Sequence, residues 1–352
     1  MLSICIIAKN EEKHIERCLS ALVPLKAEII FVDTGSTDNT KEIAAQYTDK
    51  IYDFTWCNDF SAARNFAISK ASNNCILSVD ADEILTLYNE KQLQNVIQEI
   101  SSSEEFILGQ INCRSLYISN GDEQAENESI PRMFSKNIFE YSGIVHEQLT
   151  PKANACTYIY KDTSLSFDHY GYLGDDDFIN KKTERNIELL QKMHDANPDD
   201  PYIMYQLGKS YFMRHDYTSA CDIFGKCLYF DLDPALDYVQ DLVTSYGYTL
   251  INTAQYETAL SLEGVYEDFK YSCEFIFMMG LVYMNNGLLD SAIKEFTKAT
   301  SFKSCKIEGT NSFRANYNIA VIYECAGQKS LAREYYKKCG RYSPAKLRLR
   351  KL

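Results

Sequence analysis

The sequence predicts an α/β domain in residues 1–180, followed by an all-α domain of helical repeats in residues 181–352. Two observations predict this organisation. Short β-branched runs alternate with amphipathic stretches through the first hundred residues, which is typical of βαβ units around a mostly parallel sheet. Past residue 175 the pattern becomes helical and remains so to the end, and small residues recur there in register.

Four strands and three helices are expected in the first hundred residues. The strands are short apolar runs, at residues 3–8, 28–33, 50–54 and 75–80. The helices have apolar residues at helical spacing, at residues 11–22, 37–47 and 61–71. A hydroxyl at Ser36 or Thr37 is expected to cap the second helix, and Asp59 to begin the third.

The region from residue 107 to residue 167 predicts short strands and polar loops. Its acidic stretch Asn120-Gly121-Asp122-Glu123 predicts a mobile loop, where an acceptor could be admitted. A domain boundary is expected between residues 175 and 195.

The helical half contains four copies of one pattern of small residues. A small residue is followed twelve positions later by an alanine in each copy, in the pairs Gly208/Ala220, Gly247/Ala259, Gly280/Ala292 and Ala320/Ala332. Small residues let paired helices approach closely, and aromatics such as Phe224, Phe296 and Tyr336 then fill the space between repeats. The second copy has Glu263 in place of the aromatic residue. The pattern resembles the tetratricopeptide repeat.

Charge and composition argue against several classes of protein. The formal net charge of −13 and the pI near 5.0 argue against a general affinity for nucleic acid. No run of about 18 uncharged apolar residues occurs, so no membrane-spanning segment is expected. Twelve scattered cysteines without a C-x-x-C pair, and an amino terminus without a basic leader, favour the reducing cytoplasm. The basic run from Lys346 to Lys351 could touch an acidic membrane surface or be a solvated tail.

Three acids follow the fourth predicted strand, in Asp80-Ala81-Asp82-Glu83. Crowded carboxylates raise one another's pKa unless a cation neutralises them, and the carboxyl ends of strands are where open α/β sheets bind ligands. Mg²⁺ or Mn²⁺ would suit these oxygens and could bridge to a diphosphate. The alternative is an exposed loop or helix start, where this tripeptide is common.

Further polar residues are expected at the same edge of the sheet. Asp33 ends the second strand and could accept hydrogen bonds from a base or ribose, and Asn10, which follows the first strand, is expected to bind the nucleotide as well. Asp38 is interpreted as a turn or capping residue. Arg64 could meet a phosphate there with its fork of donors, or form a structural ion pair with one of the acids.

Four motifs in order resemble family 2 glycosyltransferases of the GT-A fold, whose domain transfers sugars from nucleotide diphosphates. The motifs are Ile6-Ile7-Ala8-Lys9-Asn10-Glu11-Glu12, Val32-Asp33-Thr34-Gly35-Ser36-Thr37-Asp38-Asn39-Thr40, Asp59-Phe60-Ser61-Ala62-Ala63-Arg64-Asn65 and Val79-Asp80-Ala81-Asp82-Glu83. The resemblance implies that Asp33 contacts the base or ribose, and that Asp59 and Arg64 help to seat the nucleotide. It also implies that Asp80 lies near the ribose and metal, and that Asp82 binds the metal.

Later motifs resemble the branch of the family that includes the sublancin-type peptide S-glycosyltransferases. They are Pro131-Arg132-Met133-Phe134, Gly143-Ile144-Val145-His146-Glu147 and His169-Tyr170-Gly171-Tyr172. Glu147 is the candidate general base for the acceptor, while His146 could instead be the base, hold Glu147 in place or anchor the loop with it. His169 is expected either as a further metal ligand after Asp80 and Asp82 or as a hydrogen-bonded structural residue.

These features together predict a metal-dependent hexosyltransferase that uses a nucleotide-sugar donor, and a UDP-sugar is the expected donor. The resemblance implies that the transfer inverts the configuration of the sugar. The repeats favour a peptide or protein acceptor, and homodimerisation is the other use expected of them. An envelope or polysaccharide glycosyltransferase and a non-catalytic repeat scaffold are the alternatives. A nucleotidyltransferase is disfavoured because Lys9-Asn10-Glu11-Glu12 is not a glycine-rich basic loop.

Overall fold

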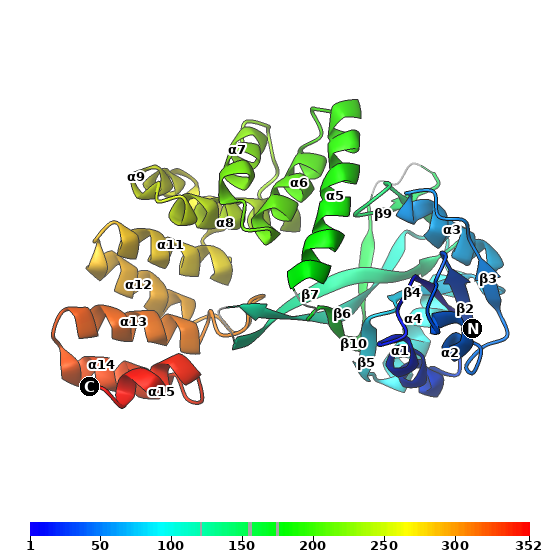
Figure 1. The fold of residues 1–352 in the computed structure, drawn as a ribbon, viewed down its shortest axis with the longest axis horizontal. Coiled ribbons are helices and arrows are strands. Elements are labelled where there is room, and N and C mark those ends of the chain that lie inside the picture. The colour runs from blue at the N-terminus through cyan, green and yellow to red at the C-terminus, as the bar shows by residue number, and fades with distance from the viewer. Residues whose placement is uncertain (120–121, 154–156, 174–175) are drawn as a thin grey trace. The chain divides into compact units, whose positions relative to one another are not determined.

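The computed structural model describes residues 1–119, 122–153, 157–173 and 176–352. The chain divides into two compact units, Met1–Ile179 and Asn180–Leu352. Figure 1 shows the first unit as a sheet with helices and the second as helices alone. The predicted α/β domain followed by tetratricopeptide-like helices is therefore confirmed as a fold class. Of the predicted loop at residues 120–123, the first two residues lie outside the described part of the chain.

The first unit contains an eight-stranded sheet in the order β3-β2-β1-β4-β7-β6-β10-β5 within the described residues. Its strands are β1 Leu2–Ala8, β2 Glu28–Asp33, β3 Ile51–Asp53, β4 Cys75–Asp80, β5 Glu83–Leu87, β6 Ile107–Ser119, β7 Asp122–Ser135 and β10 Ile159–Tyr172. The four strands predicted in the first hundred residues correspond to β1, β2, β3 and β4. They pair in parallel, β1 with both β2 and β4, and β2 with β3. β7 is antiparallel to β4 and β6, so the complete sheet is mixed. A separate hairpin pairs β8 Phe139–Ser142 with β9 Gln148–Pro151.

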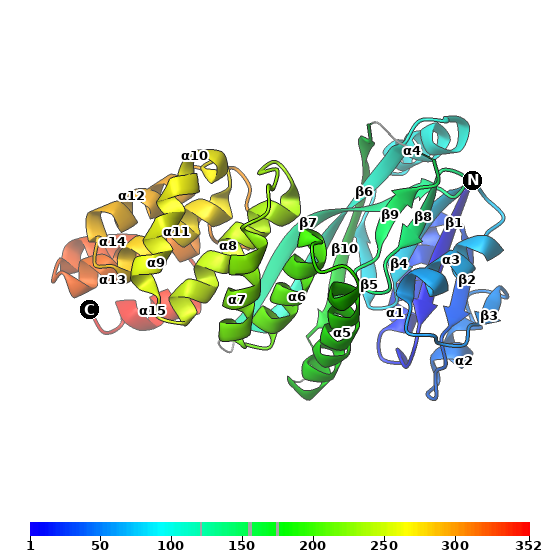
Figure 2. The ribbon, with the colours of Figure 1, turned by 90° about the horizontal axis from the view of Figure 1, so that it is seen from above.

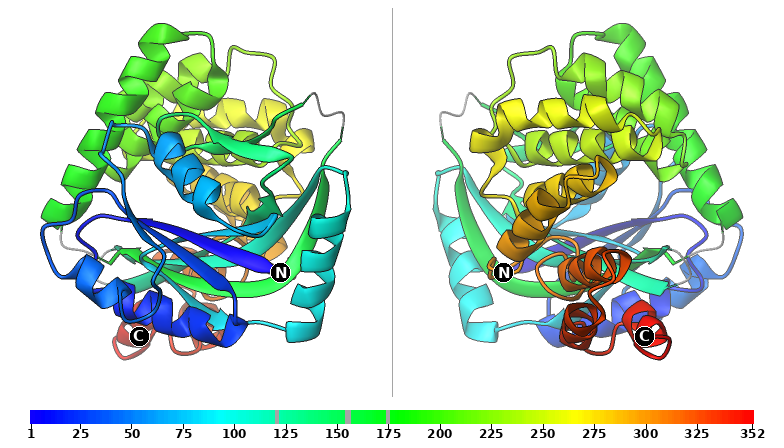
Figure 3. Two further views of the ribbon diagram at one scale, coloured as in Figure 1. Left: turned by 90° about the vertical axis from the view of Figure 1, so that its right-hand side faces the viewer. Right: turned by 90° about the vertical axis from the view of Figure 1, so that its left-hand side faces the viewer.

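Alternate residues of the central strands are buried on opposite faces of this sheet. One face, with Ile4 and Ile6 of β1, packs against α1 Ile15–Leu22, α2 Thr40–Ala44 and α4 Glu90–Ser102. The other face, with Cys5, packs against α3 Phe60–Lys70 and the β8–β9 hairpin. A short 3-10 helix, η1 Val23–Leu25, follows α1. Figure 3 shows the sheet between these two layers of helices. Burial on both faces explains why the strands read as continuous apolar runs.

Two local predictions in this unit are wrong. The strands between residues 107 and 172 are long, with 13 residues in β6 and 14 in both β7 and β10. The second helix begins at Thr40 with Asn39 at its N-cap and no side-chain cap. Ser36 and Thr37 do not cap it, because the Ser36 hydroxyl accepts a hydrogen bond from the N–H of Asn10 and the Thr37 hydroxyl donates one to Asn10 Oδ1.

The second unit is helical, and the long helix α5 Asp176–Ala196 leads into it. Its further helices are α6 Pro201–Met213, α7 Tyr217–Cys227, α8 Asp237–Asn252, α9 Tyr256–Ala259, η2 Leu260–Val265, α10 Tyr266–Phe269, α11 Cys273–Asn285, α12 Leu289–Ala299, α13 Phe313–Cys325, α14 Lys329–Lys338 and α15 Ser343–Leu349. Figure 2 shows successive helices packed side by side in antiparallel pairs. No helix of the described residues has both the length and the hydropathy required to cross a bilayer.

The repeated small residues lie where helices of a pair meet. A Cβ on Gly208 would lie 2.3 Å from the ring of Phe224, and one on Gly280 would lie 2.6 Å from the ring of Phe296. The second copy departs from this arrangement, since Gly247 lies against Met278 and the chain after Ala259 turns into η2. The copy that has Glu263 in place of the aromatic residue is thus the one whose second helix, α9, ends after four residues and continues as η2.

Candidate active site

The ends of three parallel strands meet at one edge of the sheet. The register pairs Ala8 with Asp33 and Ile7 with Asp80, so β1, β2 and β4 end at nearly the same level. The loops that follow these strands must therefore be neighbours. This edge is the one at which open α/β sheets bind their ligands.

Asn10 and Asp33 hold the first two of these loops together. Asn10, which has a left-handed backbone with φ +58°, accepts a hydrogen bond at Oδ1 from the N–H of Thr37, at 2.8 Å. The buried carboxylate of Asp33 accepts hydrogen bonds from the N–H groups of Gly35 and Ser36, each at 3.1 Å to Oδ2. Both predicted nucleotide-binding residues are thus fixed in place by their neighbours.

Asp38 accepts hydrogen bonds from the backbone of Glu12 and Thr40, which agrees with its interpretation as a turn residue. Asp59 is the N-cap of α3, and its Oδ1 accepts a hydrogen bond from the N–H of Ala62 at 2.9 Å. The predicted start of the helix at Asp59 is therefore confirmed. The Asp59 carboxylate caps this helix in the structure.

Arg64 projects from α3 into a buried cluster of charges. It donates from Nη2 to Asp80 Oδ1 at 2.6 Å, from Nη1 to Ser78 Oγ at 2.9 Å and from Nε to Glu147 Oε1. Its side chain is only 7% exposed. Of the two roles expected for Arg64, the structure shows the ion pair with an acid at this edge, and all three of its nitrogen atoms are used within the protein.

Asp80 is held between two arginines. Its second oxygen, Oδ2, accepts a hydrogen bond from Nη2 of Arg132 on β7 at 2.8 Å. Burial by itself would raise the pKa of Asp80, but Arg132 and Arg64 hold that pKa well below its usual range. Asp80 is therefore an ionised carboxylate with both oxygens in ion pairs, which argues against its predicted role as a metal ligand.

Glu83 completes this buried cluster. It is 1% exposed, accepts a hydrogen bond from the N–H of Asp80 at 3.0 Å, and lies 3.3 Å from Arg132 Nη2. Burial raises the pKa of Glu83, although Arg132 opposes the shift, and Asp80 adds to it. The cluster of Arg64, Arg132, Asp80, Glu83 and Glu147, called the arginine clamp below, has one more acid than bases. A proton retained on Glu83 would balance it.

Asp82 has a different neighbour from Asp80. Asp82 Oδ2 lies 3.4 Å from Nε2 of His169, because β5 pairs antiparallel with β10 and sets His169 opposite Glu83. Nδ1 of His169 lies 3.2 Å from Ser115 Oγ, a contact that orients the ring with Nε2 toward Asp82. A Cβ on Gly171 would lie 2.2 Å from Asp82 Oδ2, so only glycine allows the backbone to lie so close behind the pair.

The Asp82–His169 pair is suited to a divalent cation. One carboxylate and one imidazole make a mixed oxygen and nitrogen donor set, which Mn²⁺ accepts and which leaves most of its coordination positions to a ligand and water. Among the described residues no three His, Cys, Asp or Glu side chains form a group that could hold a metal. By itself the Asp82–His169 pair therefore offers two donor atoms.

The predicted base residues lie in the turn between β8 and β9. Glu147 is paired with Arg64, and its side chain is 11% exposed. His146 has a left-handed backbone with φ +51°, and its Nε2 is buried without a hydrogen-bond partner among the described residues. Burial lowers the pKa of His146, so its imidazole is neutral at pH 7. No hydrogen bond in the described part of the chain links the His146 and Glu147 side chains.

Sequence reasoning missed the roles of Arg132 and Glu83. Arg132 stands in a motif that carried the family resemblance, but the sequence showed no partner for it. Its partner lies on β4, which is distant in the sequence and is brought next to β7 only by the pairing of the two strands. The register sets Met133 opposite Leu77, and this pairing brings Arg132 to Asp80. Its Nε is buried and has no hydrogen-bond partner within the described residues.

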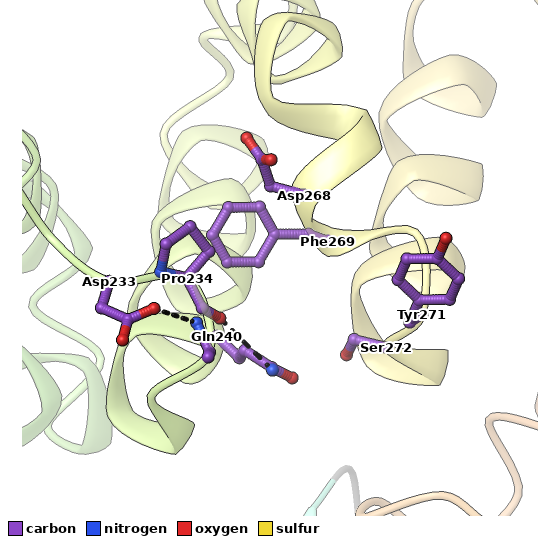
Figure 4. Close-up of a pocket in the computed structure, with 8 residues that line it drawn as sticks. Asp233, Pro234, Gln240, Asp268, Phe269, Tyr271 and Ser272 are labelled. Atoms are coloured by element: carbon purple, nitrogen blue, oxygen red, sulfur yellow. Dashed lines mark hydrogen bonds between the residues drawn. The ribbon is translucent and has the colours of Figure 1, made fainter.

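The second unit has a surface pocket of its own, of about 400 Å³. Figure 4 shows Phe269 beside Pro234, with Asp233 and Gln240 joined to neighbouring backbone by hydrogen bonds. None of the predicted site residues lines this pocket.

Residues 3–149 match the family Glycosyl transferase family 2, and residues 274–304 and 313–346 match the Tetratricopeptide repeat. The first unit carries a glycosyl transferase family 2 domain. The expected family is thereby confirmed for this domain, as is the repeat class of the second unit.

Similar proteins support the same assignment. The chain is 30% identical over 227 residues to the SPbeta prophage-derived glycosyltransferase SunS of Bacillus subtilis, covering 63% of this chain and 52% of that protein. It is 29% identical to a TPR repeat-containing protein of Synechococcus elongatus, covering 62% of this chain and 54% of that protein. It is 28% identical to the lipopolysaccharide core biosynthesis glycosyltransferase LpsC of Rhizobium meliloti, covering 44% of this chain and 58% of that protein. The chain thus spans between 52% and 58% of the length of these three relatives.

Proposed function

We propose that the chain is a metal-dependent, inverting glycosyltransferase that moves a hexose or N-acetylhexosamine from a nucleotide sugar to a peptide or protein acceptor. The observation that carries the proposal is the Asp82–His169 pair, at the edge where β1, β2 and β4 end, in a family 2 domain. Asn10 and Asp33 in the adjoining loops are the proposed contacts to the base or ribose. A UDP-sugar is the proposed donor.

The chain's own residues divide the work of donor binding. Asp82 and His169 would hold a Mg²⁺ or Mn²⁺ ion, which supplies charge stabilisation to the departing diphosphate. Arg64 and Arg132 fix Asp80 beside that pair as an ionised carboxylate, able to accept a hydrogen bond from a ribose hydroxyl. In this proposal Arg64 acts through Asp80, and not by direct contact with phosphate.

The transfer is proposed as a single displacement. The acceptor atom forms a bond to C1 of the sugar while the bond from C1 to the diphosphate oxygen breaks, so the configuration inverts. The acceptor's proton passes to Glu147, whose carboxylate Arg64 orients, or to the neutral imidazole of His146.

The helical repeats support a peptide or protein acceptor, since stacked helix pairs form extended surfaces of the kind that bind chains. An envelope polysaccharide is the second candidate acceptor, favoured by the similarity to LpsC. Association of two copies through the repeats is the other proposed use of this unit. The free, mostly buried cysteines of the described residues favour the cytoplasm as the working compartment.

Release of the nucleoside diphosphate tests the catalytic proposal. Purified full-length chain is incubated with Mn²⁺ and a panel of nucleotide sugars, and diphosphate is measured for the wild type and for Asp82→Asn. Asp49→Ala is the matched control, because Asp49 is an exposed acid of the same unit. Diphosphate release by the wild type and the control, with loss in Asp82→Asn, is the expected result.

Absence of release with every donor, or release that is equal in Asp82→Asn, contradicts the proposal and favours the non-catalytic scaffold. Thermal unfolding of each variant separates loss of the site from loss of the fold.

A further inference from the structure

The last helices of the second unit carry a concentration of basic residues. Residues 329–352 contain nine Lys and Arg and a single acid, Glu334, whereas the whole chain contains 36 Lys and Arg against 49 Asp and Glu. The rest of the chain is therefore strongly acidic. Charge is segregated along the molecule, and not spread evenly over its surface.

Helical spacing arranges these basic residues on the outer faces of α14 and α15. Lys329 and Lys337 lie eight positions apart on α14, about 80° apart around the helix axis, and Lys346 on α15 lies four positions before Arg350, the C-cap of that helix. All four are exposed. The two helices, at the red end of the chain in Figure 1, turn Ala332, Tyr336 and Ala345 inward to a common core.

Most of these cations lack an acidic partner. Lys338 pairs with Glu334 and Arg348 with Glu324, and Arg333 donates to the backbone carbonyl of Leu352. The other six are exposed and form no salt bridge within the described residues. These six define the C-terminal basic surface: Lys329, Lys337, Arg341, Lys346, Arg350 and Lys351.

Apolar side chains are exposed among the same cations. Leu347 on α15 is 54% exposed and Leu331 on α14 is 37% exposed. Leu349, two residues after Leu347, packs instead against the common core of α14 and α15. Exposed leucines beside long basic side chains suit the boundary of a bilayer, where the leucines enter the acyl region and the cations reach phosphate.

We propose that the C-terminal basic surface docks the chain on a membrane surface of anionic phospholipids. Phosphate headgroups offer the negative charge that these six cations lack inside the protein. The acidic remainder of the chain is repelled by the same headgroups, so the charge segregation sets which face approaches the lipid. Such binding is reversible and salt-sensitive, because screening shortens the reach of the charges to about 8 Å at physiological ionic strength.

This proposal does not rest on the proposed function, and it is tested without turnover. Full-length chain is sedimented with vesicles of phosphatidylcholine alone and of equal parts phosphatidylcholine and phosphatidylglycerol, at low and high salt. The test variant carries Lys346→Glu, Arg350→Glu and Lys351→Glu. The matched control carries Lys91→Glu, Lys294→Glu and Lys303→Glu, which reverse three exposed charges elsewhere.

The wild type and the control are expected to sediment with the anionic vesicles only, at least tenfold more than the test variant, and high salt is expected to release them. Leu347→Ser is expected to weaken binding without abolishing it. Equal binding to neutral vesicles, equal binding by the test variant, or no binding to any vesicle contradicts the proposal. Binding to soluble heparin without binding to vesicles also contradicts it, and assigns the surface to a soluble polyanion. Thermal unfolding shows whether the test variant remains folded.

Discussion

Asp80 and Asp82 lie two residues apart in one turn, yet their surroundings differ. Asp80 has both oxygens in ion pairs with Arg64 and Arg132, whereas Asp82 lies beside His169. A carboxylate neutralised by two arginines has little charge left for a cation, while a carboxylate beside an imidazole forms part of a donor set. We therefore propose that the arginine clamp fixes the shape of the site, and that the Asp82–His169 pair meets the ligand.

The largest effect on activity is expected at the Asp82–His169 pair, which is called the ligand side below. His169→Ala should lower metal-dependent diphosphate release on the order of 1,000-fold, because a bound metal contributes several kcal/mol of charge stabilisation and about 1.4 kcal/mol changes a rate tenfold. The measurement is steady-state turnover at saturating donor. His215→Ala, at an exposed histidine of the second unit, is the control. A fall of less than about tenfold would remove His169 from the metal site.

Changes in the arginine clamp are expected to lower the stability of the fold. Arg132→Met leaves Asp80 and Glu83 buried without one of their cations, and should lower the free energy of unfolding by about 3–5 kcal/mol. Denaturant unfolding measures the change. Arg341→Met, at an exposed arginine, should change it by no more than about 0.5 kcal/mol. Adding Glu83→Gln to Arg132→Met should recover part of the loss, and absence of recovery would contradict the charge balance assigned to the clamp.

Packing in the repeats offers a control for loss of fold without change at the site. Gly280→Ala forces a Cβ against Phe296 and should lower the free energy of unfolding by about 1–3 kcal/mol. Gly264→Ala, which has nothing within 4 Å of its added Cβ, should not cause this clash. Donor hydrolysis by the folded Gly280→Ala variant should equal the wild type. Unequal hydrolysis would show that the repeats contribute to the donor site.

The smallest expected effect is a dependence on pH. The pKa of Asp80 is depressed in the folded protein, so its contribution to stability is complete above the unfolded value of about 3.9 and is lost as pH falls through the folded value. The difference in unfolding free energy between the wild type and Asp80→Asn should therefore narrow by about 1 kcal/mol from pH 4 to pH 3. A difference that is constant with pH would mean that Asp80 is not paired as described.

The sequence predicted the residues of the ligand side better than those of the clamp. Asp82 comes just after a strand recognisable from its own apolar run, and local patterns of this kind fix where a loop begins. The clamp depends on β7, whose first half contains Asp122, Glu123, Glu126 and Glu128, which are poor strand formers. Pairing with β6 along its whole length makes it a strand, and such pairing is not visible in local sequence.

Helix starts show the same division between local and distant causes. Asp59 caps α3 as predicted, because the N–H group that it satisfies, that of Ala62, is only three residues away. Ser36 and Thr37 were predicted to cap α2 by the same rule, but the hydroxyls of both residues form hydrogen bonds with Asn10 instead. Competition from a residue 27 positions distant could not be predicted from the helix itself.

Binding of Mn²⁺ tests most directly the claim that the two acids of the triplet have different roles. Electron paramagnetic resonance measures free Mn²⁺ as it is titrated into wild type, Asp80→Asn and Asp82→Asn in the presence of UDP. The account predicts that Asp82→Asn loses Mn²⁺ binding, whereas folded Asp80→Asn retains it. Loss of binding in Asp80→Asn with retention in Asp82→Asn, or equal loss in both folded variants, would contradict it.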